Sequence, residues 1–458
     1  MREMNNEKRV RLLGFAMLLA MLTALLIAEV NRARGIKLFE SYMVLIPFMF
    51  LGMSLMRPSR RGHDYWLGVI WIGWLVLSRV LLGDIYFRRS GYEWFSLDCA
   101  AYLFALPFAW QMEDGQKKRG LYMVSVLLFV AIGLAAWLAL ICGIGGENAS
   151  IPHVGGNFGF DDAGNGTYRL TISGHPNISA ALIGLAIMLG IWLMCASKYR
   201  RWLLLPVLVL FAGLYSAFAL TMSRTNMIQL ALFAGMLLVL FLLRRIPAQT
   251  KGRWLKIAGS ILAGAVAAVL VFQSSYWIVD GFNAIKHSVI SAQAEEQMAE
   301  ASDDEEQRTG YIGSRPIGAD LATMTGRSDI YRETIRNLLQ NPKALMLGST
   351  SPAELVMEGH PHAHNAYLQI VVCMGIPGLL MALWFSLRAV WASCRMVFCY
   401  LKKASMADLV LVCAILTMLV GTIPETYLFY NGEAKLYNVA FFLLYGYLIE
   451  TERRLRAA

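Results

Sequence analysis

The sequence predicts an all-α, polytopic membrane protein with about twelve transmembrane helices and one large extracytoplasmic loop. Hydrophobic residues make up 57% of the 458 residues and charged residues only 16%, whereas soluble domains are about 45–50% apolar and about 25% charged. Apolar runs long enough to cross a bilayer recur along the chain, and basic residues gather on alternate sides of them. These observations exclude a soluble enzyme and a disordered chain.

The predicted spans are runs of about 20 mostly apolar residues. Twelve such runs occur, at 12–30, 39–56, 65–83, 95–112, 121–143, 177–196, 202–222, 226–243, 257–279, 366–387, 407–424 and 434–449. The first run is too long for the apolar part of a signal peptide and lacks a cleavage pattern of small residues. We therefore expect it to remain as the first span.

The distribution of Lys and Arg predicts that both termini lie in the cytoplasm. With the N-terminus inside, 25 of the 41 Lys and Arg fall in cytoplasmic segments, against 8 of the 31 Asp and Glu. Such an excess of basic residues marks the cytoplasmic side of membrane proteins. The net charge of +10 therefore indicates a cytoplasmic belt beside membrane lipids, and we expect no nucleic-acid partner.

Loops and spans divide the chain into four parts. Helices one to five and an outer loop over 144–176 occupy residues 1–176, helices six to nine 177–279, a large extracytoplasmic loop 280–363, and helices ten to twelve 364–458. Loops longer than about 15 residues are usually functional or disordered. Within the large loop, the acidic stretch 295–306 is typical of a solvated surface. Residues 328–340 have the apolar spacing of an amphipathic helix, which we expect to lie on the membrane surface.

Arginines at the predicted outer edge are the first candidates for function. Arg224 lies between two spans with almost no loop, where an ionisable residue is a functional candidate or extends to the headgroups. Arg327 follows Gly326 just before the amphipathic helix, and a helix N-terminus beside an arginine is suited to bind an anion. Arg169 precedes the sixth span, whose helix Asn177 is expected to cap.

A polar cluster before the tenth span is the second candidate. It holds His360, His362 and His364, followed by Asn365. Alternating histidines could bind a metal, or His364 could serve as a general base whose neutral form is favoured by the helix N-terminus. Interfacial histidines without a role are the third possibility.

Two further features have sufficient structural explanations. Arg79, inside the third span, has Asp84 nearby as a possible partner. In the tenth span, Gly375 and Gly378 permit close helix packing, and Pro377 is expected to kink the helix.

Together these residues resemble the motifs of the O-antigen ligase / Wzy-type O-antigen polymerase family. The resemblance covers about residues 165–425, and it is carried by Arg169 with Pro176-Asn177, Ser223-Arg224, Gly326-Arg327, Pro342 with Gly348, His364-Asn365-x-x-Leu368 and Gly375-Ile376-x-Gly378-Leu379. The order, spacing and sidedness of these elements are more specific than any one of them. The chain departs from the family pattern in having a single glycine at 348 and Tyr331 where a tryptophan is common.

The resemblance implies a GT-C-like glycosyltransferase of the bacterial cytoplasmic membrane that needs neither a metal nor a cofactor. Its donor would be an undecaprenyl-pyrophosphate-linked glycan and its acceptor a hydroxyl of a glycan or lipid, attacked with inversion at the sugar. The catalytic residues would be His364 as general base, which contributes about 10²–10⁴-fold, and Asn365 as its orienting partner. The pyrophosphate would be held by arginine forks, and the implied substrate-binding set is Arg224, Arg327, Arg169, Asn177, His362 and Tyr331.

Other functions stay open at this stage. A ligase and a Wzy-type polymerase share this chemistry and differ in the acceptor. A transporter or flippase of lipid-linked glycans would also suit twelve spans, but we find no related halves and no charged residues grouped at mid-membrane. A sensor or scaffold would use the outer loops only to bind a partner.

Overall fold

The computed structural model describes a large part of the chain. The described residues are 63–83, 114–144, 149–150, 157–162, 168–173, 175–196, 204–247, 252–297, 324–360, 362–429 and 434–457, with a few single positions before residue 107. Apart from those positions, the predicted spans 12–30, 39–56 and 95–112 lie outside the described residues. So does the acidic stretch beyond residue 297.

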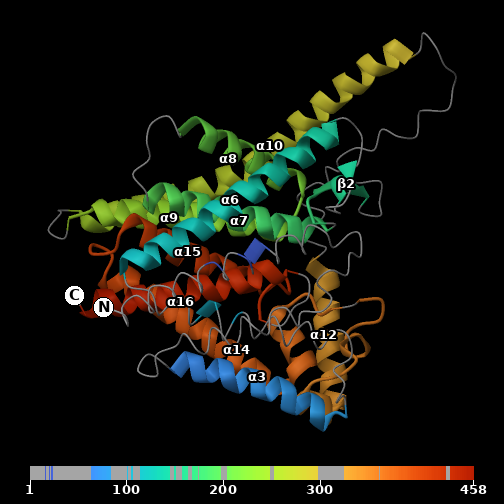
Figure 1. The fold of residues 1–458 in the computed structure, drawn as a ribbon, viewed down its shortest axis with the longest axis vertical. Helices are drawn as coiled ribbons and strands as arrows, with labels where there is room; N and C mark the ends of the chain where they lie inside the picture. Colours follow the sequence, from blue (N-terminus) through green and yellow to red (C-terminus); the bar gives the residue numbers. More distant parts are fainter. Residues whose placement is uncertain are drawn as a thin grey trace. The chain divides into compact units, whose positions relative to one another are not determined.

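Helices make up most of the described chain (Figure 1). Within the described part of the chain, six helices are long and apolar enough to cross a membrane. They are α3 (His63–Leu81), α6 (Asp114–Ile144), α7 (Pro176–Ala196), α9 (Arg224–Arg245), α10 (Arg253–Gln297) and α14 (Ala366–Cys399). Two shorter apolar helices are α8 (Leu204–Leu220) and α15 (Met406–Gly421), and α16 (Lys435–Ala457) follows them. Each of these helices lies at a predicted span, while the total of twelve spans stays a prediction.

The chain forms two compact units. The first comprises Met1–Glu29, Lys37–Val124 and Gly318–Ala458, and the second Val30–Ile36 and Ser125–Ile317. The first unit therefore contains α3 and all described helices from α12 (Met324–Gln340) onward. The second contains most of α6, the helices α7 to α10 and a small sheet.

A small sheet that was not predicted accompanies the helices, which make up most of the described chain, as the all-α class predicted. Strands β1 (Ala149–Ser150), β2 (Asn157–Asp162) and β3 (Tyr168–Thr171) pair antiparallel in the order β1-β2-β3. Phe160 and Leu170 lie opposite each other in this register, and both are buried. The alternation of apolar residues is too short in each strand to stand out in the sequence, because the strands have only two to six residues.

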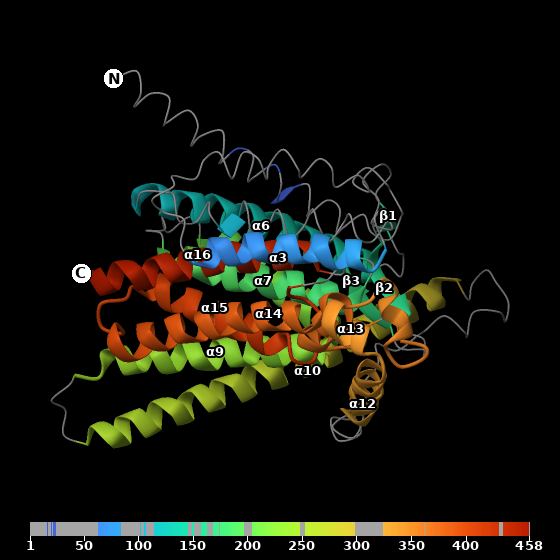
Figure 2. The same cartoon turned by 90° about the horizontal axis from the view of Figure 1, so that it is seen from below.

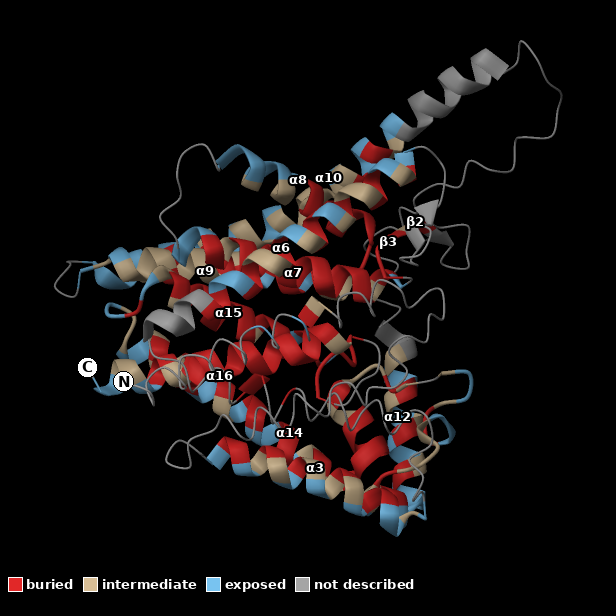
Figure 3. Cartoon of the chain, viewed as in Figure 1, coloured by how far each residue is buried: buried red, intermediate tan, exposed pale blue. Residues whose placement is uncertain are grey.

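Within the second unit, α7 is the central helix and α10 a peripheral one. Figure 3 shows α7 buried along most of its length and α10 largely exposed. Helices α9 and α10 approach closely where Gly264 faces Gly235: a Cβ atom on Gly264 would lie 2.7 Å from the Gly235 carbonyl oxygen. At about 1.5 Å per residue, the 45 residues of α10 exceed the thickness of a bilayer.

Aromatic side chains fill the core of the first unit around Phe429. Its ring centroid lies 5.9–6.4 Å from those of Trp71, Tyr367, Phe441 and Phe442. The Asn438 side chain of α16 accepts from the Phe429 amide at 3.0 Å and donates to the Phe429 carbonyl at 3.3 Å. These contacts fix the segment that follows α15.

Helix α14 is broken rather than merely bent. Gly375 has φ 70° and ψ −171° inside the helix, two residues before Pro377. The predicted kink is thus confirmed, and its cause is a left-handed glycine. A Cβ atom on Gly375 would lie 2.2 Å from the Met346 carbonyl oxygen, at the end of α13 (Pro342–Leu347), so close packing at this glycine is with the loop backbone.

Helix α12 confirms the predicted amphipathic helix, with a correction at its start. It begins at Met324, so Arg327 lies in its first turn and not before it. Leu338 is buried, whereas Leu339 is 65% exposed. Figures 1 and 2 both show α12 running crosswise to α3 at one end of the first unit. After α13, the short 3₁₀ helix η7 (Pro352–Glu354) leads toward α14.

Candidate functional site

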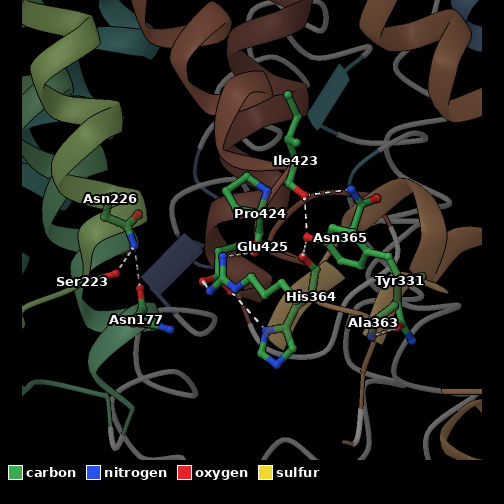
Figure 4. Close-up of polar contacts among 12 residues, drawn as sticks. Asn177, Ser223, Asn226, Tyr331, Ala363, His364, Asn365, Ile423, Pro424 and Glu425 are labelled. Atoms are coloured by element: carbon green, nitrogen blue, oxygen red, sulfur yellow. Dashed lines mark hydrogen bonds and ion pairs between the residues drawn. The ribbon is translucent and has the colours of Figure 1, made fainter. Parts of the chain in front are cut away.

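Asn365 caps the N-terminus of α14. Its Oδ1 accepts from the Leu368 amide at 2.9 Å, and its Nδ2 donates to the Ile423 carbonyl at 2.8 Å (Figure 4). The Ala366 amide donates to the Thr422 carbonyl at 3.0 Å. The side-chain amide of Asn365 is thus used to join the start of α14 to the segment after α15.

His364 precedes this cap in a left-handed conformation, with φ 49°. A non-glycine residue there is uncommon and costs about 1–3 kcal/mol, so the surroundings must hold it. Tyr331 of α12 contributes, because its hydroxyl donates to the His364 carbonyl at 2.9 Å. The His364 ring points toward Glu425, and Nδ1 lies 3.9 Å from Oε2 (Figure 4). Nδ1 is buried and makes no hydrogen bond within the described part of the chain.

Glu425 is the centre of this cluster, and only 5% of its side chain is exposed. Arg327 Nη2 donates to Glu425 Oε1 at 2.8 Å, and Nη1 donates to the Pro424 carbonyl at 2.8 Å. Burial raises the pKa of Glu425, but the His364 imidazole and the Arg327 guanidinium outweigh it and hold the pKa below its ordinary value. The carboxylate is therefore ionised at neutral pH and lies between the Arg327 guanidinium and the His364 imidazole.

The sequence analysis missed Glu425. The residue follows Ile423-Pro424 directly after the predicted span 407–424. An acid flanked by apolar residues at the outer end of a span was the available signal, because ionisable groups at membrane depth are functional candidates. The residues predicted from the sequence at the outer membrane edge were arginines, histidines and polar residues, with no acid among them.

Tyr331 is a hydrogen-bond donor in this arrangement. Burial raises the pKa of its hydroxyl, and the charge of Arg327 opposes the rise only in part. The hydroxyl thus stays protonated and able to donate to the His364 carbonyl. Tyr331 and Arg327 lie on one side of α12, so one helix contacts both the histidine turn and the carboxylate.

The other histidines lie close to His364. The ring centroid of His362 is 4.2 Å from that of His364, and His360 is 6.0 Å away. Among the described residues, no group of three or more His, Cys, Asp or Glu side chains could hold a metal ion. The alternating histidines thus do not belong to such a group within the described residues.

The second unit holds the remaining predicted residues. Arg169 lies in β3, opposite Asp161 in register. Ser179 ties the end of β3 to the first turn of α7, because its Oγ accepts from the Ile172 amide at 2.9 Å. Helix α7 begins at Pro176, so the predicted cap residue Asn177 instead lies within the first turn.

Arg224 is the first residue of α9, as the short connection between spans predicted. Met222, with φ 50°, makes the tight turn from α8, and Ser223 occupies the cap position. The Asn226 side chain donates to Ser223 Oγ at 2.8 Å and to the Asn177 carbonyl at 3.2 Å (Figure 4). The starts of α7 and α9 are therefore joined, and Arg224 lies at a helix N-terminus, the end of a helix that attracts anions.

The two units thus bring the predicted residues into two groups. Arg327, Tyr331, His362, His364 and Asn365 gather in the first unit, and Arg169, Asn177 and Arg224 lie in the second.

These features define a class: a multi-pass membrane protein that collects charged and hydrogen-bonding side chains at helix ends. Residues 208–383 match the family model described as O-antigen ligase, which agrees with the resemblance seen in the sequence. No curated protein matches the chain. The matched region includes Arg224, Arg327 and His364, whereas Arg169 and Glu425 lie outside it.

Proposed function

We propose that this protein transfers a glycan from undecaprenyl pyrophosphate to an acceptor hydroxyl at the outer face of a bacterial cytoplasmic membrane. The match of residues 208–383 to the O-antigen ligase family model supports a glycosyltransferase of surface polysaccharide biosynthesis. The observation that carries the specific chemistry is the buried carboxylate of Glu425, which contacts Arg327 and faces His364.

The proposed reaction is an inverting displacement at the anomeric carbon. A sugar hydroxyl is a weak nucleophile, and His364 takes its proton as the new carbon–oxygen bond forms. The bond from the anomeric carbon to the pyrophosphate oxygen breaks, and its electron pair leaves with undecaprenyl pyrophosphate. Atoms and charge balance without a metal or a cofactor.

Glu425 gives His364 its base character in this proposal. A proton taken by the imidazole creates a cation, which the nearby carboxylate stabilises, as an acid–histidine pair does in other transferases and hydrolases. Arg327 holds the carboxylate in place with one nitrogen and the Pro424 carbonyl with the other. We therefore assign Glu425 and Asn365 as positioning residues and His364 as the catalytic residue.

The pyrophosphate is proposed to bind to arginines. Arg224 combines a fixed guanidinium fork with the positive end of the α9 dipole. The resemblance also implies phosphate contacts for Arg169 and for Arg327, and Arg327 has N–H donors beyond the two that contact Glu425 and Pro424. Asn177, His362 and Tyr331 are the proposed polar contacts to the glycan.

The test is transfer of a fluorescent lipid-linked glycan in proteoliposomes. We expect His364→Ala to lower the transfer rate by about 10²–10⁴-fold and Arg224→Gln to lower it by weakening stabilisation of the leaving group. Arg336→Gln is the matched control, because this arginine of α12 is 62% exposed. Wild-type rates in the His364 and Arg224 variants would disprove the proposal.

A Wzy-type polymerase is the alternative of the same chemistry. The acceptor is then a second lipid-linked repeat unit instead of a finished lipid or glycan. Gel analysis of surface polysaccharide from a deletion strain distinguishes them, since a lost polymerase shortens chains and a lost ligase leaves full-length chains unattached.

A further inference from the structure

The break in α14 leaves three carbonyl groups at the end of its outer half, residues 366–374. Each of the three accepts a hydrogen bond from elsewhere in the first unit. The Val372 carbonyl accepts from the Ser349 amide at 2.8 Å, and the Met374 carbonyl accepts from Trp74 Nε1 at 2.8 Å. The last carbonyls of any helix need partners outside it, and here tertiary contacts supply them.

Arg79 of α3 is the third partner and the only charged one of the three. Its Nη2 donates to the Cys373 carbonyl at 3.4 Å, and its Nη1 donates to the Ser349 carbonyl at 2.9 Å. Arg79 is only 4% exposed. The predicted partner Asp84 lies outside the described residues, but the two carbonyls already account for a buried guanidinium here. A cation at the C-terminal end of a half-helix also opposes the negative end of its dipole.

The two carbonyls that Arg79 contacts belong to separate branches of the candidate site. The outer half of α14 runs about 14 Å from Cys373 to the Asn365 cap, beside His364. Ser349 follows α13, which packs against α12, the helix that carries Arg327 and Tyr331. The two branches pack in backbone contact at Gly348. A Cβ atom on Gly348 would lie 2.2 Å from the Cys373 carbonyl oxygen.

We propose that Arg79 is a positioning residue that fixes His364 relative to Arg327 and Tyr331 from inside the membrane-spanning part of the first unit. The inference rests on the proposed function for its effect on catalysis, but not for its effect on geometry. Arg79 contacts no substrate in this proposal. It holds the two branches in register, and loss of its fork lets the outer half of α14 shift against the loop.

The test compares Arg79→Met and Arg79→Lys with Ser78→Ala. Methionine keeps the volume and removes both donated bonds, and lysine keeps the charge without the two-pronged fork. Ser78 is the matched control, because it is buried beside Arg79 and its hydroxyl donates to the Leu75 carbonyl of its own helix.

Two readouts are measured on detergent-solubilised, full-length protein that passes a thermal-unfolding check. The first is the rate at which diethyl pyrocarbonate modifies His364, with the exposed His63 at the other end of α3 as internal reference. We expect several-fold faster modification of His364 in Arg79→Met, an intermediate rate in Arg79→Lys and no change in Ser78→Ala. The second is glycan transfer, where we expect kcat to fall by about 10–100-fold in Arg79→Met with KM for the donor unchanged.

Each outcome decides the proposal. An unchanged His364 modification rate in folded Arg79→Met overturns it. If Arg79→Met does not fold, Arg79→Lys takes its place in both readouts, and failure of both variants to fold reduces Arg79 to a structural role and also overturns it. If the wild-type protein transfers no glycan, the proposed function fails, while the modification rates still determine whether Arg79 positions His364.

Discussion

Glu425→Gln is the most informative perturbation of the candidate site. The substitution keeps the shape of the side chain, and glutamine Oε1 can still accept from Arg327. What it removes is the negative charge 3.9 Å from His364 Nδ1. The attraction between an imidazolium and a carboxylate at that distance is about 4 kcal/mol at an effective dielectric constant of about 20, and about 1 kcal/mol in bulk water. Since about 1.4 kcal/mol is a factor of ten, we expect the transfer rate to fall by about 5–1,000-fold.

The assay is single-turnover transfer at saturating donor, which isolates the chemical step. Glu425→Gln is expected to lower this rate, and Glu333→Gln is the control because Glu333 lies on the surface of α12, where it pairs with the exposed Arg336. A Glu425→Gln rate within twofold of wild type would refute the reasoning that the carboxylate stabilises a protonated His364. An equal loss in the two variants would assign the effect to the loss of one negative charge in general and not to the position of Glu425 beside His364.

Three further predictions concern the same region. Tyr331→Phe removes the hydrogen bond to the His364 carbonyl, which costs about 1 kcal/mol, so thermal unfolding in detergent should shift down by a few degrees and transfer should slow. The pKa of Glu425 is held below its usual 4.5. The stability that this group contributes is therefore present above about pH 4.5 and is lost as the pH falls through the folded-state pKa. Unfolding curves between pH 6 and 3 should show a smaller loss of stability in Glu425→Gln than in wild type. Gly375→Ala should destabilise strongly, because its Cβ atom meets the Met346 carbonyl, whereas Gly73→Ala, with open space around it, should leave the unfolding temperature unchanged or higher.

The sequence predicted the elements whose signals are long and local. Spans such as 177–196 follow from an unbroken apolar run, and α12 follows from apolar spacing. A kink in α14 was predicted from Pro377, because proline removes a helical hydrogen bond, but the break itself lies at Gly375. His364 and Arg327 were predicted because their residue types suit base and anion chemistry at a membrane edge, and Tyr331 was implied by the family resemblance. The structure places the three close together.

The contacts that join these elements could not be predicted in the same way. Glu425 reaches Arg327 across 98 positions of the chain, and no local pattern encodes that pairing. For Arg79 the sequence suggested Asp84 as a possible partner, whereas its carbonyl partners are backbone atoms, which carry no residue-type signal. The sheet at β2 and β3 has too few residues for its alternation to exceed chance.

The partners of Arg79 also set a condition on how the chain is made. Ser349 and Cys373 lie 270 and 294 positions further along the chain. A ribosome that adds about 5–20 residues per second needs roughly 14–60 seconds to reach them. Until then, α3 must reside in the bilayer with a charge that costs about 2.5–3.5 kcal/mol to insert. A chain that stops before residue 349 therefore lacks both of these carbonyl partners of Arg79, and synthesis through α14 supplies them.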